Sequence, residues 1–202
     1  VAKLIKDGVE PSEIVAFTFT VKAAEEIKER IRERVRKFAG QDAADRIGTM
    51  YVGTIHGYCL QMLQQQVPEY ETYEMADENQ LAAFVIRWDQ ELNLRQFDID
   101  RPDGNGKPYD GLRTFLANVA VLENDLIRLE QLPDDIAAFK NAVKKLYELL
   151  DQHRMLTFGM QIARAIEALE NPETRERITA GIRHLIVDEY QDVNIAQERL
   201  IQ

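Results

Sequence analysis

The alternation of hydrophobic and polar positions in the first third of the chain predicts strands and helices in turn. Residues 14–20 (IVAFTFT) are β-branched and aromatic and follow a turn signal at 10–12, which predicts a buried strand. The next segment is amphipathic and predicts a helix that ends at Gly40. The apolar positions of this helix recur at helical spacing and are Ala24, Ile27, Ile31, Val35 and Phe38.

A second strand and a second helix follow. Residues 49–52 predict a strand closed by Gly53, and residues 55–66 predict a helix that Pro68 terminates. The order strand, helix, strand, helix favours a parallel sheet with helices on its faces.

Helical patterns then follow one another from about Asp77 for roughly a hundred residues, with no convincing strand, and this is longer than an ordinary crossover connection. The stretch therefore predicts an inserted helical domain. Asp77 and Gln80 have the spacing of a capping box at the start of a helix over 78–92. The other segments of the insertion are a loop at 102–108 and helices at 111–123, 135–152, 158–170 and 173–180.

The last part of the chain returns to a strand pattern. Residues 185–189 are an apolar run that ends in two carboxylates, which predicts a third strand of the first sheet. Asp192 or Asn194 would cap a helix that begins near Ile195. We therefore expect an α/β fold in which a parallel sheet is interrupted by a mostly helical insertion.

Composition and charge narrow the class of protein. The chain is 45% hydrophobic and 30% charged, as in globular proteins that bury a core. Its net charge of -10 opposes binding of nucleic acid by bulk electrostatics, so any such contact must be local. The single cysteine, Cys59, excludes an internal disulfide, argues against a Cys-based zinc site and suits a reducing cytosol.

Neither a membrane span nor a signal peptide is predicted. No stretch approaches the ~20 apolar residues that cross a bilayer, and residues 1–6 lack the form of a signal peptide. We therefore expect a cytoplasmic protein with no membrane partner. Residues 1–6 and 200–202 both lie in predicted helices, so we also expect that the chain is cut from a longer protein.

Two adjacent carboxylates stand at the end of the third predicted strand. Asp188 and Glu189 would lie at the carboxyl edge of the sheet, where ligands bind in open α/β folds. Such a pair suits phosphoryl transfer, because Mg²⁺ prefers oxygen ligands and a second carboxylate can orient or deprotonate the attacking water. Taken alone, an apolar-Asp-Glu run is more often a solvated strand end or a helix cap.

The end of the first strand carries groups that suit a nucleic-acid strand. Phe19 offers a flat surface on which a base can stack, although aromatic residues in strands usually pack in the core. Thr18, Thr20 and Lys22 surround a helix N-terminus and can hold phosphate through hydroxyls, amides and charge. Capping and solvation are the alternative explanation for these three residues.

The next strand-to-helix turn carries Thr54 and His56. Both can contact a phosphate or the turn backbone, and a lone histidine is more often structural than catalytic. We therefore expect backbone positioning or DNA contact from His56, not acid-base chemistry. Cys59, on the following helix, is expected to pack in the core.

Three segments resemble motifs of the UvrD/Rep/PcrA-type superfamily 1A DNA helicases. Residues 188–192 (DEYQD) resemble motif II, Asp-Glu-aromatic-Gln-Asp. Residues 18–27 (TFTVKAAEEI) resemble motif Ia, and residues 53–57 (GTIHG) resemble motif Ib. Their order, with a helical insertion before motif II, is also that of the family. Residues 156–158 resemble the Asp-Phe that begins the matching helix.

The resemblance implies a partial RecA-like sheet of the P-loop NTPase type from the N-terminal motor domain. Residues 1–70 and 178–202 would form subdomain 1A, and residues 71–177 the helical subdomain 1B. The parent would be an ATP hydrolase that translocates 3′ to 5′ on single-stranded DNA and unwinds duplex. ATP and Mg²⁺ would be its cofactors. Its partners would be single-stranded DNA, duplex junctions and repair or replication proteins.

The resemblance also assigns roles to residues. Asp188 would bind Mg²⁺, Glu189 would act as the general base, and Gln191 would sense the nucleotide and link it to the DNA site. All three would contact the nucleotide, and Asp192 would support the turn. The DNA path would be lined by Thr18, Phe19, Thr20, Lys22, Thr54 and His56.

The chain departs from the family pattern at three positions. Val21 replaces the usual Asn of motif Ia, which removes one amide hydrogen bond. Ile55 replaces the usual Phe of motif Ib, which weakens any stacking there, and Thr157 stands where Asp is common. None of these changes touches the paired carboxylates.

Three other interpretations stay open. A helicase-nuclease subunit of the RecB or AddA type would carry the same motifs and differ only further downstream. A nucleic-acid-binding module could retain the fold without ATPase activity. A helical scaffold with an incidental carboxylate pair would explain the helices but not three motifs in order. DNA repair, replication restart and recombination are not distinguished as pathways.

We expect that the isolated chain neither hydrolyses ATP nor unwinds DNA. No Gly-x-x-x-x-Gly-Lys-Ser/Thr occurs in its 202 residues, so the backbone cradle and the lysine for the phosphates are missing. The second motor domain is missing as well. Phosphate release from ATP with and without single-stranded DNA checks this, and measurable DNA-stimulated hydrolysis by the chain alone would refute it.

Overall fold

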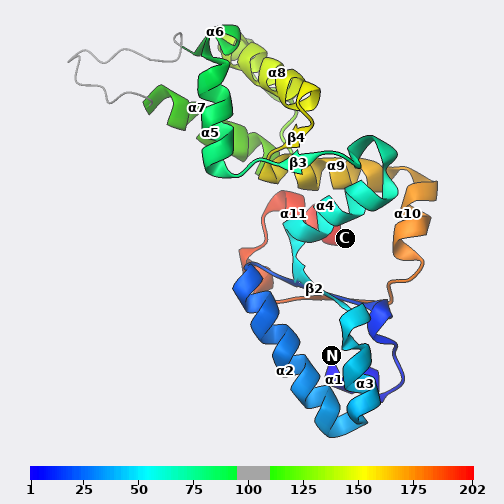
Figure 1. The fold of residues 1–202 in the computed structure, drawn as a ribbon. Coiled ribbons are helices and arrows are strands. Elements are labelled where there is room, and N and C mark those ends of the chain that lie inside the picture. The colour runs from blue at the N-terminus through cyan, green and yellow to red at the C-terminus, as the bar shows by residue number, and fades with distance from the viewer. Residues whose placement is uncertain (95–109) are drawn as a thin grey trace.

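The computed structural model describes residues 1–94 and 110–202, and its helices cover both faces of a small sheet (Figure 1). In chain order the helices and strands are α1 (Ala2–Lys6), β1 (Ile14–Thr18), α2 (Val21–Ala39), α3 (Gln41–Asp45), β2 (Tyr51–Thr54), α4 (Ile55–Gln66), β3 (Glu74–Met75), α5 (Glu78–Arg87), α6 (Asp89–Leu92), α7 (Asp110–Asn124), α8 (Ala137–Gln152), β4 (Met155–Leu156), α9 (Phe158–Glu170), α10 (Pro172–Thr179), β5 (His184–Val187) and α11 (Ile195–Ile201).

The main sheet is parallel, in the order β2-β1-β5. Side chains of β1 alternate between its two faces, as the period of a strand requires. Val15 and Phe17 belong to the larger core, beneath α4, α9 and α11, and Ile14 belongs to the smaller core with α1, α2 and α3. The predicted α/β class and the parallel sheet are confirmed, with both faces of the sheet covered by helices.

The second strand differs from the prediction. Residues 46–49 form a 3₁₀ turn, and β2 continues through Gly53 to Thr54 instead of stopping at position 52. A Cβ at Gly53 would lie 2.6 Å from the hydroxyl oxygen of Tyr51, which reaches over the strand to donate a hydrogen bond to the Thr54 carbonyl. Gly53 is therefore needed for this close approach and does not end the strand.

Three further expectations needed correction. The helix predicted over 78–92 breaks at Trp88 into α5 and α6. The stretch predicted to lack strands contains β4, which pairs with β3 in a two-residue parallel ladder. Phe38, predicted to lie on the apolar side of α2, is 55% exposed. The loop predicted at 102–108 lies outside the described residues.

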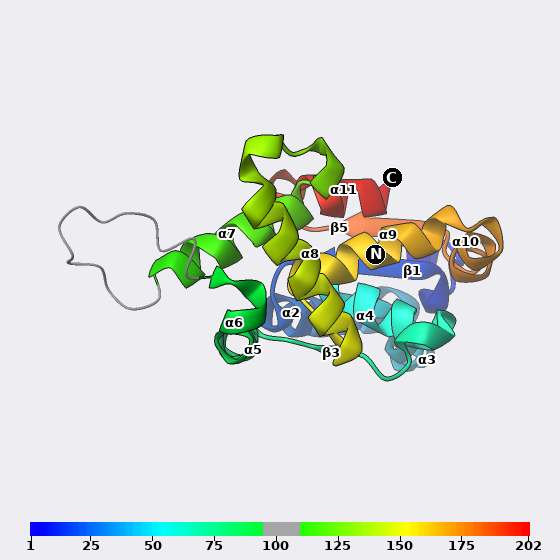
Figure 2. The same cartoon turned by 90° about the horizontal axis from the view of Figure 1, so that it is seen from above.

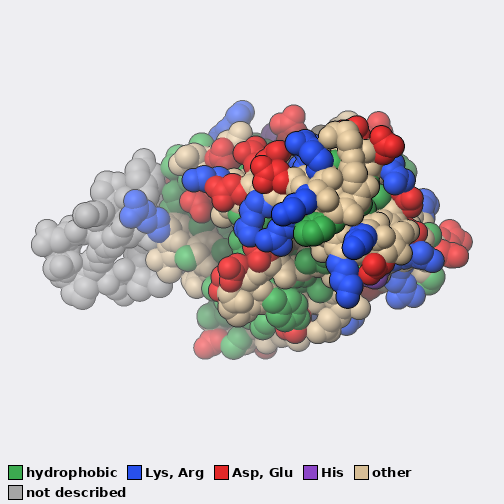
Figure 3. All heavy atoms as spheres, turned by 90° about the horizontal axis from the view of Figure 1, so that it is seen from below, with side chains coloured by type: hydrophobic (Ala, Val, Ile, Leu, Met, Phe, Trp, Pro, Cys, Tyr) green, Lys and Arg blue, Asp and Glu red, His purple; other side chains and the backbone are tan. Residues whose placement is uncertain are grey.

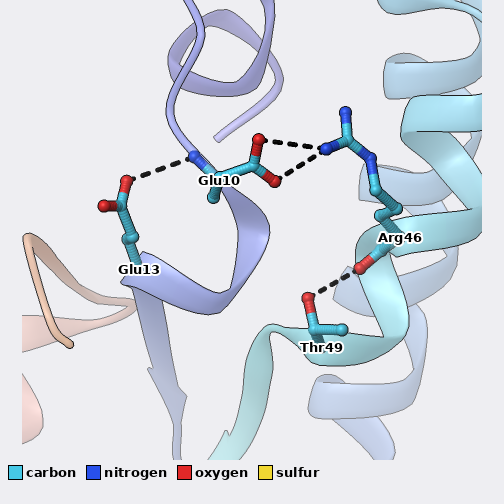
Figure 4. Close-up of polar contacts among 4 residues, drawn as sticks. All are labelled: Glu10, Glu13, Arg46 and Thr49. Atoms are coloured by element: carbon cyan, nitrogen blue, oxygen red, sulfur yellow. Dashed lines mark hydrogen bonds and ion pairs between the residues drawn. The ribbon is translucent and has the colours of Figure 1, made fainter.

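An ion pair joins the segments that precede β1 and β2, at the amino ends of these strands. Arg46 Nη1 donates to both carboxylate oxygens of Glu10, at 3.0 and 2.8 Å (Figure 4). The backbone N–H of Glu10 donates to the Glu13 carboxylate, and the Thr49 hydroxyl donates to the Arg46 carbonyl. The ion pair is exposed, so it contributes little energy but links the entries to β1 and β2.

Charges of both signs cover the surface. Basic and acidic side chains are interspersed on the face seen from below (Figure 3). On the outer side of α2, Lys22 pairs with Glu26 and Arg32 pairs with Glu29. Within residues 1–94 and 110–202, no helix combines the length and apolar character that crossing a bilayer requires.

The helices α5 to α8 form the end of the molecule farthest from α1 and α3 (Figures 1 and 2). Their buried side chains, such as Phe115, Val143 and Leu146, join those of α4 and α9 in one continuous core. Helix α9 packs along α4, so the helical segment rests on the sheet through these two helices. The division into residues 1–70 with 178–202 and 71–177 stays a prediction.

A carboxyl group is buried within this helical part. Glu123, near the end of α7, is 7% exposed and accepts a hydrogen bond of 2.7 Å from the buried Thr157 hydroxyl. A Cβ at Gly159 would lie 2.3 Å from the Glu123 Cβ, so only glycine fits beside it. Burial raises the pKa of Glu123 to about 7, although hydrogen bonds from Thr157, Tyr147 and the Gly159 backbone oppose the shift.

The raised pKa predicts how stability changes with pH. Between its ordinary value of 4.5 and about 7, folded Glu123 holds a proton that the unfolded chain has lost, so stability falls as pH rises. Relative to the Glu123→Gln variant, the native chain should lose about 3 kcal/mol between pH 5 and pH 8, as an upper estimate from the pKa change. Urea unfolding of both proteins at the two pH values measures the difference. Parallel pH profiles would contradict it.

Candidate active site and nucleic-acid interface

The carboxyl ends of all three main strands meet in one row of the sheet. Thr18 is paired in register with Thr54 of β2, and Phe17 is paired with Val187 of β5. One residue further, the backbone N–H of Asp188 donates to the Phe17 carbonyl at 2.9 Å. The predicted acidic pair therefore leaves the same sheet edge as the two threonine-bearing strand ends.

The segment after β5 forms a tight acidic turn, residues 188–192, whose side chains are all exposed. Glu189 has left-handed backbone angles, φ 50° and ψ 45°, which reverse the chain into a 3₁₀ turn at Tyr190–Asp192. The Gln191 side-chain amide donates to the Glu189 carboxylate, and the backbone N–H of Asp192 donates to the Glu189 carbonyl. Gln191 thus fixes the carboxylate of Glu189, two residues earlier, and both of these hydrogen bonds are accepted by Glu189.

The donor set of this turn suits a hard cation. Asp188 and Glu189 form no ion pair with any Lys or Arg of the described residues. Exposed carboxylate oxygens that lack a cationic partner are the ligands that Mg²⁺ prefers. Among residues 1–94 and 110–202, no three or more His, Cys, Asp and Glu side chains gather as a metal site. Phosphate and water oxygens would therefore have to complete the coordination shell.

The turn after β1 is built by two threonines with different roles. Thr18 is buried, and its hydroxyl donates to the Thr20 carbonyl at 2.9 Å and accepts from the Thr20 N–H at 3.3 Å. Thr20 is exposed and caps α2 by accepting from the Ala23 N–H at 3.0 Å. The buried hydroxyl of Thr18 therefore holds the turn, and the DNA contact expected of Thr18 stays a prediction.

Phe19 lies between these threonines and faces outward. Phe19 is 38% exposed, whereas Phe17, two residues earlier in β1, is 3% exposed and packs in the core. Lys22 lies in the first turn of α2 with its ammonium group in solvent, 4.0 Å from Glu26. A ring that is partly exposed, three residues before an exposed lysine, can accept a base, so core packing alone does not account for Phe19.

The turn after β2 carries Thr54 and His56. Thr54 caps α4 by accepting from the Gly57 N–H at 3.0 Å. Burial lowers the pKa of His56 below its ordinary value, so the ring is neutral at neutral pH. A neutral, half-buried ring suits a hydrogen bond or a packing contact more than a charge contact with phosphate.

The structure adds Phe158 to this turn. Phe158 is the first residue of α9, is 42% exposed, and meets His56 edge-on with ring centroids 5.2 Å apart. The sequence pattern predicts only the start of a helix at this position. An aromatic residue directly after a threonine cap is a local signal, but it does not predict contact with a residue about a hundred positions earlier.

The three departures from the family pattern have local explanations. Val21 is exposed at the first position of α2, where its side chain fills no buried space. Ile55 is buried in the larger core, so this position offers no surface for stacking. Thr157 caps α9 through its hydroxyl oxygen and also donates to Glu123, which an ionised aspartate could not do. Cys59 is buried in the same core, as expected.

Comparisons with known proteins agree with this geometry. A family model described as UvrD/REP helicase N-terminal domain matches residues 1–202. The chain is 28% identical over 200 residues to the ATP-dependent DNA helicase UvrD1 of Mycobacterium leprae, covering 95% of this chain and 24% of that protein. It is 27% identical over 215 residues to the ATP-dependent DNA helicase PcrA of Leuconostoc citreum, covering 100% and 26%.

A eukaryotic relative matches as well. The ATP-dependent DNA helicase SRS2 of Saccharomyces cerevisiae is 26% identical over 212 residues, which cover 95% of this chain and 17% of that protein. The chain thus spans about a quarter or less of the length of these three relatives.

The left-handed backbone of Glu189 predicts an unusual order of stability. A side chain in this conformation is strained by roughly 1 kcal/mol, and glycine is not. Glu189→Gly should therefore be about 1 kcal/mol more stable than Glu189→Ala, the reverse of their order at an ordinary helical position. Both variants lack the carboxylate, so urea unfolding isolates the backbone effect. A more stable alanine variant would exclude the left-handed turn.

Proposed function

The chain belongs to the UvrD/REP helicase N-terminal domain family, and on that basis we propose that it is the first motor domain, in part, of an ATP-dependent DNA helicase. The parent protein would use ATP hydrolysis to move 3′ to 5′ along single-stranded DNA and to unwind duplex. The observation that carries the proposal is the shared sheet edge, where the turn after β1 lies between the acidic turn after β5 and the Thr54 turn after β2. Coupling of ATP hydrolysis to movement along DNA requires that the nucleotide site and the single-strand site lie close together.

The acidic turn would serve the nucleotide. Asp188 would hold Mg²⁺, which supplies charge neutralisation to the nucleotide phosphates when bound. Glu189 would accept the proton of the attacking water, and its exposed carboxylate is free of ion pairs among the described residues. Gln191, which donates to that carboxylate, would orient it and respond to the presence of nucleotide. Asp192 would support the turn through its backbone bond to Glu189.

The two threonine turns would serve the single strand. Phe19 would stack on a base, and Lys22 with the cap of α2 at Thr20 would contact phosphate. Thr54 and His56 would continue the path across the start of α4, and the exposed ring of Phe158 extends it. These local contacts are compatible with a net charge of -10, because stacking does not need a basic surface.

The three relatives described above are named as ATP-dependent DNA helicases, which favours this proposal over a helicase-nuclease subunit. The exposed acidic pair favours it over a binding module without ATPase activity. We also propose duplex junctions and repair or replication proteins as partners, and a cytoplasmic location that suits a single buried thiol.

The test is single-strand binding by the 202-residue chain. Phe19→Ala should weaken binding of labelled oligo(dT) by about 1–3 kcal/mol, roughly 5- to 160-fold, because one stacking surface is lost. Lys22→Ala should weaken it and reduce its dependence on salt, because one phosphate contact is lost. Fluorescence anisotropy at several salt concentrations measures both effects.

The other end of α2 offers matched controls. Phe38 is exposed and Lys37 lies beside it, far along the helix from the proposed path. Phe38→Ala and Lys37→Ala change the same residue types and should leave affinity unchanged. If the variants at positions 19 and 22 bind like these controls, no strand follows the proposed path.

A further inference from the structure

The buried carboxyl of Glu123 is hydrogen-bonded to Thr157, the residue before Phe158, which extends the proposed strand path. Its Oε2 accepts the Thr157 hydroxyl at 2.7 Å, and the Thr157 oxygen in turn accepts the Met160 N–H at 3.1 Å. Thr157 is the N-cap of α9, and Phe158 is the next residue. One hydroxyl thus joins the end of α7 to the first turn of α9.

The contact leaves little freedom at this junction. Thr157 is 3% exposed and Glu123 is 7% exposed, so water cannot readily replace their bond. Gly159 lies so close to Glu123 that a single added carbon would overlap its side chain. The start of α9 is therefore held on two sides of Phe158, by a hydrogen bond before it and by close packing after it.

The end of α7 is itself fixed to the sheet domain. The Asn194 side-chain amide donates to the Asn124 side-chain oxygen at 3.0 Å. Asn194 caps α11, the helix that follows the acidic turn, by accepting from the Gln197 N–H at 2.8 Å. Glu123 and Asn124 are neighbours in α7. Glu123 contacts the cap of α9, the helix that begins at Phe158, and Asn124 contacts the cap of α11, the helix that follows the acidic turn.

We propose that Glu123 is a positioning residue for the single-strand surface: through Thr157 it holds Phe158 against His56. This rests on the proposed function, because it gives the ring pair the role of a strand contact. Glu123 acts only through Thr157 and does not itself touch the strand. Because Asn124 adjoins it, the same end of α7 keeps the ring pair in register with the helix after the acidic turn.

The pKa of His56 is a readout of the position of Phe158. Burial lowers this pKa below 6.5, so a ring that is uncovered should titrate closer to 6.5. The chain has three histidines, and their ring signals can be followed separately by NMR during a pH titration. Phe158→Ala defines the shift expected when the covering ring is removed.

Two pairs of variants remove or keep the hydrogen bond. Thr157→Val and Glu123→Leu eliminate it with little change in volume, and should raise the pKa of His56 toward that of Phe158→Ala. Thr157→Ser and Glu123→Gln keep a donor or an acceptor and should titrate like the native chain. Circular dichroism and the fluorescence of Trp88, the single tryptophan, verify folding. If one of Thr157→Val and Glu123→Leu does not fold, the other one alone tests the proposal.

The same variants are then compared in oligo(dT) binding. Thr157→Val and Glu123→Leu should bind about five-fold or more weakly, the low end for one lost stacking contact, and the two conservative variants should bind as the native chain does. An unchanged His56 pKa in folded Thr157→Val and Glu123→Leu overturns the positioning role. A shifted pKa with unchanged affinity overturns its link to strand binding. If the native chain binds no oligo(dT), the proposed function fails, while the titration still tests whether Glu123 holds Phe158.

Discussion

The parallel register of β1 between β2 and β5 is the constraint on which the rest of this structure depends. Parallel strands present their carboxyl ends at one edge, and this register brings Thr18, Thr54 and Asp188 into neighbouring positions. Both faces of the sheet are covered, so a slip of one residue would move Val15 and Phe17 out of the larger core. Burial of apolar side chains therefore determines the geometry of the polar edge.

The three turns at that edge are built in different ways. Those after β1 and β2 lead straight into helices capped by Thr20 and Thr54, which satisfies backbone N–H groups locally and leaves side chains exposed. The turn after β5 instead passes through Glu189 in a left-handed conformation. Strain of this kind is maintained at sites where the surrounding structure over-determines it, and here it turns the chain from β5 into the 3₁₀ turn at Tyr190–Asp192.

The helices α5 to α8 are connected to the rest of the chain by apolar packing and by polar contacts. They share one core with α4 and α9, and polar contacts reach from the end of α7 to the caps of α9 and α11. Glu123 is the unusual member of this junction, because a buried carboxyl is tolerated only with hydrogen-bond donors around it. The proposed surface for DNA and the proposed turn for nucleotide are thereby connected through α7, which contains neither.

Local physical chemistry in the sequence was sufficient for most elements and for the residues of the acidic turn. Hydrophobic periodicity identified the three main strands and predicted α4 and α9 with their observed bounds, because amphipathic patterns and caps act within a few residues. The motif at residues 188–192 could also be identified from the sequence, since the order of its residues along the chain is what defines it. Tertiary structure alone decided which of the polar residues are accessible: it buried Thr18, exposed Phe19 and set Phe158 against His56. The same holds for Gly53 and for Glu123, whose roles depend on Tyr51 and Thr157, because close approach and burial are created by packing between segments that no local pattern relates.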